Sequence, residues 1–319
     1  MISRRHLRIK VMQALYAYFY VENDIVIAEK NLLHRIEKIY DLYLYLVQVL
    51  LEIHDFARKR MEDAKHKHLP SAEELNPNLR FLNNMVIKQI TENSLFNLHI
   101  SKNKINLMDE EELIRRLFTM IRDSKEFQEY MQLPEDSYRE DKKIVQTIFY
   151  DYIFTDTNIQ SVLEEKNLFW ADDSYIASQM IHSTISYFKE ASDASSPLPS
   201  VYKKTSSKYP DEDREYVSDL FRKTILNNKF YEEKISSYIQ NWDIDRIAQI
   251  DFILMKMALC EILEFPNVPV KVTMNEYIDI AKEYSSPSSH VFINGILDKM
   301  VIDLKKEDKI KKFGRGLKE

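Results

Sequence analysis

The first residues of the chain form a cluster of cationic side chains. Arg4, Arg5, Arg8 and Lys10 all precede the first acidic residue, Glu22. Residues three and four apart share one face of a helix, so these arginines are expected side by side on the first two turns. Cations at a helix N-terminus oppose the macrodipole, and a bound anion relieves that cost. The spacing favours an anion-binding face; the alternative is the solvated end of an amphipathic helix.

A second candidate site lies near the other end of the chain. The segment from Ser285 to Ser289 interrupts a helical pattern, and its serines offer an N-cap for a helix that continues through His290 and Phe292. An exposed Phe292 can stack on an unpaired base while nearby hydroxyls and N–H groups meet phosphates. Gly295 within this helix costs about 1 kcal/mol relative to alanine. We expect it to permit close packing of another helix, and close approach of a ligand is the alternative.

Catalytic and cofactor chemistry finds few candidates. The sequence has only 3 glycines, so no glycine-rich phosphate loop, dinucleotide fingerprint or nucleophile elbow can be drawn. Cys260 stands alone in an apolar run, which is typical of a buried structural thiol. His66, His68 and His182 lack acidic or cysteine partners at ligand spacing. We expect no catalytic activity, no cofactor and no metal site.

Helices must position the candidate residues. With so few glycines, turns depend on Pro, Asn, Asp and Ser, which favours an all-α fold. Apolar residues recur at three- and four-residue steps, and the most apolar pattern runs from Ile247 to Pro266, as in the central helix of a domain. Three further helical patterns begin at Ser3, Asp211 and His290. The others cover Ile25 to His68, Asn78 to Leu98, Asp109 to Met131, Glu135 to Asp156, Asp172 to Glu190, Tyr231 to Ile239 and the residues around Val272 to Ala281.

Composition limits the class of protein. Hydrophobic residues make up 45% and charged residues 30% of the 319 residues, as in ordinary globular proteins. The net charge of -6 is uneven, because both ends are basic and acidic residues gather in the middle. No apolar run reaches the length of about 18 residues that a membrane span needs, and no signal peptide is evident. We expect a soluble cytoplasmic protein that makes no use of a membrane.

Two distant stretches resemble the NusB transcription antitermination factors. The first stretch reads Arg4-Arg5-His6-Leu7-Arg8 followed by Gln13-Ala14-Leu15-Tyr16. The second comprises Asn241-Trp242, Arg246-Ile247-Ala248, Ile250-Asp251, Glu261-Ile262-Leu263, Val268-Pro269-Val270-Lys271-Val272, Asn275-Glu276, Ala281-Lys282 and Phe292-Ile293-Asn294-Gly295-Ile296-Leu297-Asp298-Lys299. So many matches in one order are specific.

The resemblance implies a domain organisation with one bundle built from both ends of the chain. Residues 1–21 form its first helix and residues 211–304 its C-terminal helical part, followed by a basic tail at 305–319. Between them lie a helical insertion at 22–190 and a Ser-, Pro- and Lys-rich linker at 191–210. The resemblance says nothing about the role of the insertion.

The resemblance also implies a function. It predicts binding of a single-stranded, boxA-like leader RNA together with the small-subunit ribosomal protein NusE, within an RNA polymerase antitermination complex that supports ribosomal RNA synthesis. Tyr16 and Glu261 align with positions that face the ribosomal protein. The RNA-binding residues expected on this basis are Arg4, Arg5, Arg8, Lys10, Gln13, Ser288, Ser289, His290 and Phe292. Ser288 stands where an acidic residue can occur in the family, and His6 interrupts the basic run.

Two other functions remain open at this point. One is a protein-interaction scaffold in which the insertion binds another protein and the RNA surface is degenerate. The other is a ribosomal RNA cytosine methyltransferase, since some of these carry a similar helical domain. The methyltransferase is disfavoured, because the sequence lacks a glycine-rich methyl-donor site and a catalytic cysteine in a suitable setting.

Overall fold

The computed structural model describes residues 2–21, 24–66, 76–202, 212–239 and 247–317. Within these ranges the regular elements are helices and no strand occurs, which confirms the all-α prediction. The chain divides into two compact units. We call residues 37–201 the inserted unit, and residues 2–36 with 202–319 the terminal unit.

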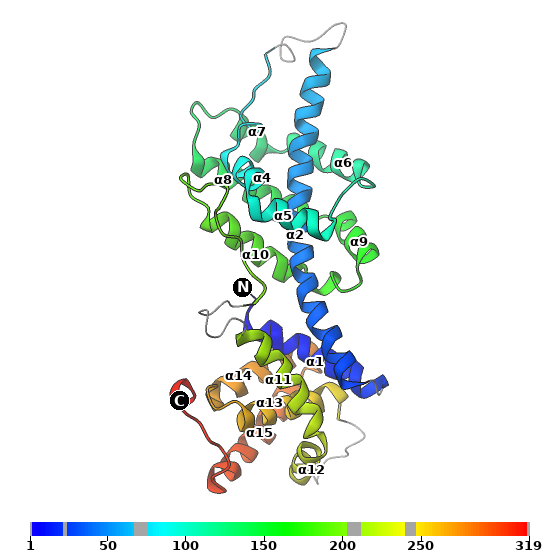
Figure 1. Cartoon of the computed structure of the whole chain (residues 1–319), viewed down its shortest axis with the longest axis vertical. Coiled ribbons are helices and arrows are strands. Elements are labelled where there is room, and N and C mark those ends of the chain that lie inside the picture. The colour runs from blue at the N-terminus through cyan, green and yellow to red at the C-terminus, as the bar shows by residue number, and fades with distance from the viewer. Residues whose placement is uncertain (1, 22–23, 67–75, 203–211, 240–246, 318–319) are drawn as a thin grey trace. The chain divides into compact units, whose positions relative to one another are not determined.

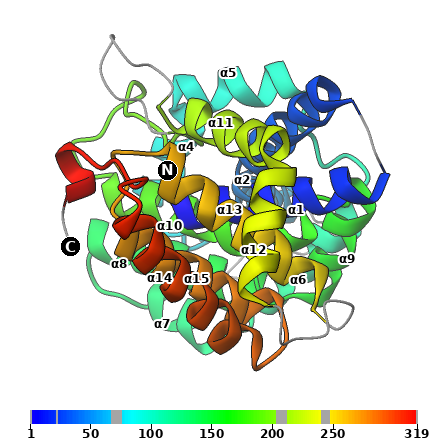
Figure 2. The same ribbon diagram turned by 90° about the horizontal axis from the view of Figure 1, so that it is seen from below.

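The terminal unit is organised around helix α13. Its helices are α1 (Arg4–Val21), the start of α2 (Ile25–Lys65), α11 (Glu212–Leu226), α12 (Asn228–Tyr238), α13 (Gln249–Glu264), α14 (Val270–Tyr284) and α15 (Ser289–Lys306). Helix α13 contacts α1, α11, α12, α14 and α15 (Figures 1 and 2). Consecutive residues such as Met255, Lys256 and Met257 are all buried, because neighbours pack on every side of the helix. The predicted central helix is thus confirmed.

The start of α2 belongs to the terminal unit, although the sequence placed residues 22–36 in the insertion. Leu32 and Ile36 are buried there. The carboxylate of Glu29 accepts a 2.5 Å hydrogen bond from the Nε of Arg222 in α11. Such a pair between residues far apart in sequence leaves no signal in local periodicity.

The inserted unit is also helical. It holds the remainder of α2 and then α4 (Met85–Glu92), α5 (Ser94–Asn103), α6 (Glu111–Arg122), α7 (Lys125–Met131), α8 (Tyr138–Thr147), the π-helical turn η1 (Ile148–Ile153), α9 (Thr157–Lys166), η2 (Ala171–Asp173) and α10 (Ser174–Tyr187). Two patterns that we read as single helices are each divided. Asn93 caps α5 through the N–H of Phe96, and Ser124 caps α7 through the N–H of Phe127. Polar caps therefore take the place of glycine at these turns.

The first part of the expected linker is fastened to the inserted unit. The side-chain amide of Asn93 donates to the carbonyl of Ser196 at 2.8 Å, and the N–H of Ser94 donates to the carbonyl of Ala194 at 2.8 Å. These bonds satisfy polar groups that packing removes from water. Residues 203–211, the rest of that segment, lie outside the described residues, as does the predicted Asn241-Trp242 motif.

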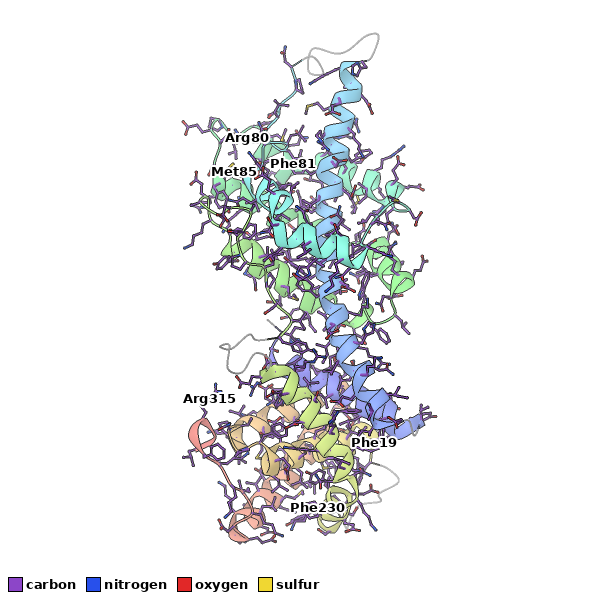
Figure 3. The ribbon with its side chains drawn as sticks, viewed as in Figure 1. Phe19, Arg80, Phe81, Met85, Phe230 and Arg315 are labelled. Atoms are coloured by element: carbon purple, nitrogen blue, oxygen red, sulfur yellow. The ribbon has the colours of Figure 1, made fainter. Side chains whose placement is uncertain are left out.

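The expected basic tail folds back onto the terminal unit. The N–H of Phe313 donates to the carbonyl of Pro266 at 3.2 Å, and the Nζ of Lys312 donates to the carbonyl of Phe265 at 2.9 Å. Lys312 thereby adds a second donor to the carbonyl of Phe265, which also accepts the N–H of Val268 at 3.1 Å. Arg315, labelled in Figure 3, lies 3.5 Å from Glu212. Residues 309–317 are hereafter called the return segment.

Candidate nucleic-acid interface

Helix α1 presents its cationic residues at its N-terminal end. Ser3 caps the helix, because its Oγ accepts a 3.3 Å hydrogen bond from the N–H of His6. Leu7, Val11 and Leu15 form the buried stripe of the helix. The three arginines flank this stripe, and each of them forms an ion pair with a carboxylate of the terminal unit.

Arg4 pairs with the start of α11. Its Nη2 lies 2.7 Å from Glu212 and its Nε 3.2 Å from Asp213. The guanidinium also lies over the ring of Tyr216, 4.8 Å from its centre. The side chain keeps 34% of its surface exposed, so one side of the guanidinium still faces solvent.

Arg5 pairs with α14. Its Nε donates to Glu276 at 3.0 Å and its Nη2 to Asp279 at 2.8 Å. The hydrogen bond to Glu276 outweighs the effect of burial and raises the pKa of Arg5. Its side chain is 36% exposed. Arg5 therefore joins the start of α1 to the C-terminal half of α14.

Arg8 lies in the core. Its Nε and Nη2 donate to the two oxygens of Glu261 at 2.9 and 2.6 Å, with side-chain exposures of 3% and 0%. The same carboxylate accepts from the hydroxyls of Tyr216 at 2.5 Å and Thr273 at 2.8 Å. Burial by itself raises the pKa of Glu261, but Arg8 and the two hydroxyls outweigh it and hold the pKa below its usual value.

These pairs correct part of the site expected from the sequence. Arg8, Lys10 and Glu261 are buried, so they do not offer their charged groups to RNA or to a ribosomal protein in this structure. Carboxylates of the chain itself offset the unfavourable interaction of these cations with the dipole of α1. Arg4 and Arg5 remain partly exposed, and Gln13 is half-buried.

The start of α15 is held by a buried carboxylate. Asp251 accepts hydrogen bonds from the hydroxyls of Ser285 at 2.5 Å and Ser289 at 2.6 Å. Ser289 is therefore buried, whereas Ser288 is exposed and is the N-cap residue, without a side-chain cap bond. We did not single out Asp251 as a functional residue. Its signal is present in the sequence, because it is one of the few charged residues in a helix that is mostly apolar.

Exposed groups follow Ser289 along α15. His290 and Phe292 are half-buried, and Val291 is 65% exposed. Both Arg5 and this segment attach to α14, since Arg5 binds Asp279 and the chain enters α15 directly after α14 ends at Tyr284. His6 lies within electrostatic reach of Glu283, while burial lowers its pKa. The start of α1 and the start of α15 are thus linked through the C-terminal half of α14.

Gly295 does not have the role that we expected. A methyl group added to its Cα would have no heavy atom within 4 Å, apart from its own helix and chain neighbours, and the residue is exposed. No helix among the described residues packs against it. The expectation of close helix packing is therefore wrong, and the alternative of an approaching ligand stays open.

The other end of α1 carries exposed aromatic residues. Tyr16 is 40% exposed and stacks on Tyr20, with ring centres 6.4 Å apart. The ring of Phe19, labelled in Figure 3, lies 5.2 Å from the ammonium of Lys256. Aromatic side chains with a polar tip are common at protein interfaces. Of the two partner-facing residues expected from the sequence, only Tyr16 is accessible.

The described part of the chain offers no cluster of side chains for a metal ion. There, no group of three or more His, Cys, Asp or Glu residues could hold a metal ion. Cys260 is buried, as predicted, and burial raises the pKa of its thiol to about 12. Among the described helices, none has the length and apolarity that crossing a bilayer requires.

Comparison with known proteins gives one family. The NusB family model matches residues 174–301. A transcription antitermination protein NusB from Salinibacter ruber is 44% identical over 110 residues, covering 34% of this chain and 69% of the relative. Proteins of the same name from Chloroherpeton thalassium and Methylacidiphilum infernorum are each 38% identical, over 33% and 28% of this chain and 49% and 64% of the relatives. No solved structure matches the chain.

Proposed function

The chain belongs to the NusB family, and we propose that it acts in transcription antitermination by binding a single-stranded, boxA-like leader RNA together with the ribosomal protein NusE. The observation that carries this proposal is the pairing of Arg5 with Glu276 and Asp279, because it joins the basic start of α1 to the helix that leads into α15. The bond to Glu276 remains when a phosphate displaces Asp279. Cationic and aromatic groups would then be available to one RNA strand. Matching segments cover half to about two thirds of the curated relatives, so RNA, partner and complex are all part of the proposal.

The exposed arginines would meet RNA phosphates by exchanging partners. Surface ion pairs are worth about 0 to 1 kcal/mol, so a phosphate can displace Glu212 from Arg4 or Asp279 from Arg5 at little cost. Arg8 cannot exchange in this way, because Glu261 would remain as a buried, unpaired charge. We assign Arg8 and Glu261 a structural role: their ion pair holds α1 in position, so that Arg4 and Arg5 can contact RNA.

The start of α15 would supply recognition of unpaired bases. Phe292 offers a ring for stacking, while Ser288 and His290 offer polar groups at the same end of the helix. Asp251 keeps this helix start in position through Ser285 and Ser289. The ribosomal protein would contact the accessible aromatic residues around Tyr16.

Fluorescence anisotropy with a labelled leader RNA tests the RNA surface. We expect the Arg4→Ala/Arg5→Ala protein to bind at least tenfold more weakly, and the slope of log affinity against log salt to fall by about 0.7 for each phosphate that the arginines no longer neutralise. The matched control is Arg115→Ala/Lys125→Ala, which removes two exposed cations from the inserted unit. Equal binding by all three proteins at physiological salt would refute the proposal.

Co-purification with NusE tests the partner surface. Tyr16→Ala should reduce capture of NusE, whereas Tyr187→Ala, which alters an exposed tyrosine of α10, should not. Unchanged capture by Tyr16→Ala would contradict the assignment of this residue. A transcription assay across a terminator then reports whether the bound complex acts on RNA polymerase.

One observation favours a second candidate, a protein-interaction scaffold with a degenerate RNA surface. Arg4, Arg5 and Arg8 are all paired with carboxylates of the chain itself. If the scaffold is correct, NusE capture persists while leader RNA binds no better than an unrelated strand. The two measurements above therefore separate the candidates.

A further inference from the structure

The terminal unit holds a cavity that neither the RNA surface nor the aromatic patch at Tyr16 uses. The cavity has a volume of about 620 Å³, which lies within the range of about 300 to 1,000 Å³ typical of small-molecule sites. It is lined by the first turns of α14, by α15 from Asn294 to Lys305, and by the return segment. Its α15 residues follow those that we assign to RNA, which lie in the first turns of that helix.

The return segment is positioned by close contact with the turn after α13. A Cβ atom on Gly316 would lie 1.9 Å from the carbonyl oxygen of Pro266, so only glycine allows this approach. The Nζ of Lys312 also donates to the carbonyls of Phe265 at 2.9 Å and Glu261 at 3.3 Å. One wall of the cavity is therefore built by contacts specific to this segment.

The charge of the cavity lining is positive. Lys271, Lys305 and Lys312 contribute three ammonium groups, against the single carboxylate of Asp298. That carboxylate is engaged by the amide of Asn294, whose Nδ2 lies 3.2 Å away. Lysine ammonium groups are compact point charges that bind phosphate well. Within the lining, three ammonium groups thus stand against one carboxylate.

The rest of the lining is apolar or neutral. Met274, Val301 and Leu317 offer an apolar surface, and Asn275 adds a second amide beside that of Asn294. An apolar lining with a few convergent polar groups is the usual form of a small-molecule site. Apolar and cationic side chains thus line the same cavity.

We propose that this cavity binds a nucleotide, with the phosphate on Lys271 and Lys305 and the base on Met274 and Val301. Lys312 lies in the lining of the same cavity. An ammonium has three N–H donors, and among the described residues Lys312 donates to two carbonyls, which leaves one donor for a ligand. The nucleotide is either free or part of an RNA strand, and the two sources share this chemistry. The inference does not depend on the proposed function, because it uses none of the residues that we assign to RNA or NusE.

Isothermal titration of the full chain with AMP, with inorganic phosphate as a second probe, tests the site. We expect saturable binding of one AMP per chain, with phosphate binding at least tenfold more weakly because it lacks the base. Lys271→Gln/Lys305→Gln should weaken AMP binding at least tenfold. The matched control, Lys299→Gln/Lys306→Gln, changes two exposed lysines of α15 outside the cavity lining and should bind as wild type does.

Further arms decide the remaining questions. Gly316→Ala should weaken AMP binding by displacing the return segment, while the helical circular dichroism signal shows that the variant is folded. Burial lowers the pKa of Lys312 to about 8, so AMP binding should weaken as the pH rises above that value. Displacement of AMP by leader RNA identifies the nucleotide as part of an RNA strand, and its absence identifies a free nucleotide. No detectable heat, or equal AMP affinity in the wild type and the Lys271→Gln/Lys305→Gln protein, would overturn the inference.

Discussion

The guanidinium of Arg8 and the carboxylate of Glu261 meet through two parallel hydrogen bonds of 2.9 and 2.6 Å in the core of the terminal unit. The two residues are 253 positions apart in the chain. Two-point geometry of this kind is specific to arginine, because its planar fork matches a carboxylate. The pair holds the basic helix α1 against the central helix α13. Arg8 therefore has a structural role, although the sequence places it in an apparent RNA-binding motif.

Removing one partner of this pair should be costly. Arg8→Met leaves the Glu261 carboxylate buried without its counter-ion, so we expect a loss of about 3 to 5 kcal/mol in the free energy of unfolding. The double variant Arg8→Met/Glu261→Leu should recover part of that loss, since no buried charge remains, although the hydroxyls of Tyr216 and Thr273 lose their acceptor. Urea unfolding followed by circular dichroism measures both. Arg5→Ala is the control and should cost less than about 1 kcal/mol, because its pairs are at the surface.

The same pair predicts a dependence of stability on pH. The folded-state pKa of Glu261 lies below its unfolded value of about 4.3. The unfolded chain therefore takes up this proton first, and the stabilisation, present above about pH 4.3, is lost as the pH falls through the folded pKa. Urea unfolding between pH 7 and pH 3 should show a steeper loss in the wild type than in Arg8→Met/Glu261→Leu. Parallel curves would contradict the assigned direction of the pKa.

Asp251 should affect RNA affinity indirectly, by holding the start of α15 in the proposed RNA surface. Asp251→Ala removes the acceptor of both Ser285 and Ser289, and unsatisfied buried groups cost about 1 to 3 kcal/mol. We expect the start of α15 to loosen and the affinity for leader RNA to fall, although no exposed residue has changed. Anisotropy titration measures the affinity, and hydrogen exchange of the first turn of α15 measures the loosening. Loosening without any change in RNA affinity would remove α15 from the proposed surface.

Gly295 should accept a side chain. Because a methyl group there meets open space, Gly295→Ala is expected to stabilise the protein by about 1 kcal/mol through helix propensity. A thermal melt against the wild type measures this gain. If the variant is less stable, a neighbour approaches Gly295 in solution. A fall in RNA affinity with the gain in stability intact would instead indicate that the ligand approaches at this point.

Local patterns in the sequence were sufficient for the helical class and the family, but not for every helix boundary. Helix α13 could be recognised because nearly every residue from Ile250 to Ile262 is apolar, and this is a property of neighbouring positions. The Ser3 cap and the buried thiol of Cys260 are likewise readable from their immediate surroundings. The helix boundaries within Asn78 to Leu98 and Asp109 to Met131 could not be read in this way. Asn93 and Ser124 act as caps only where the chain turns, and the local pattern does not show that turn.

The partners of the charged residues were settled only by the tertiary structure. Type and spacing made Arg4, Arg5 and Arg8 look alike, yet two remain partly exposed and the third is buried. The difference depends on which carboxylate packing brings to each guanidinium, and those carboxylates lie more than 200 positions away. The cavity beneath the return segment arises in the same way, because Gly316 meets Pro266 only after α13, α14 and α15 have packed together.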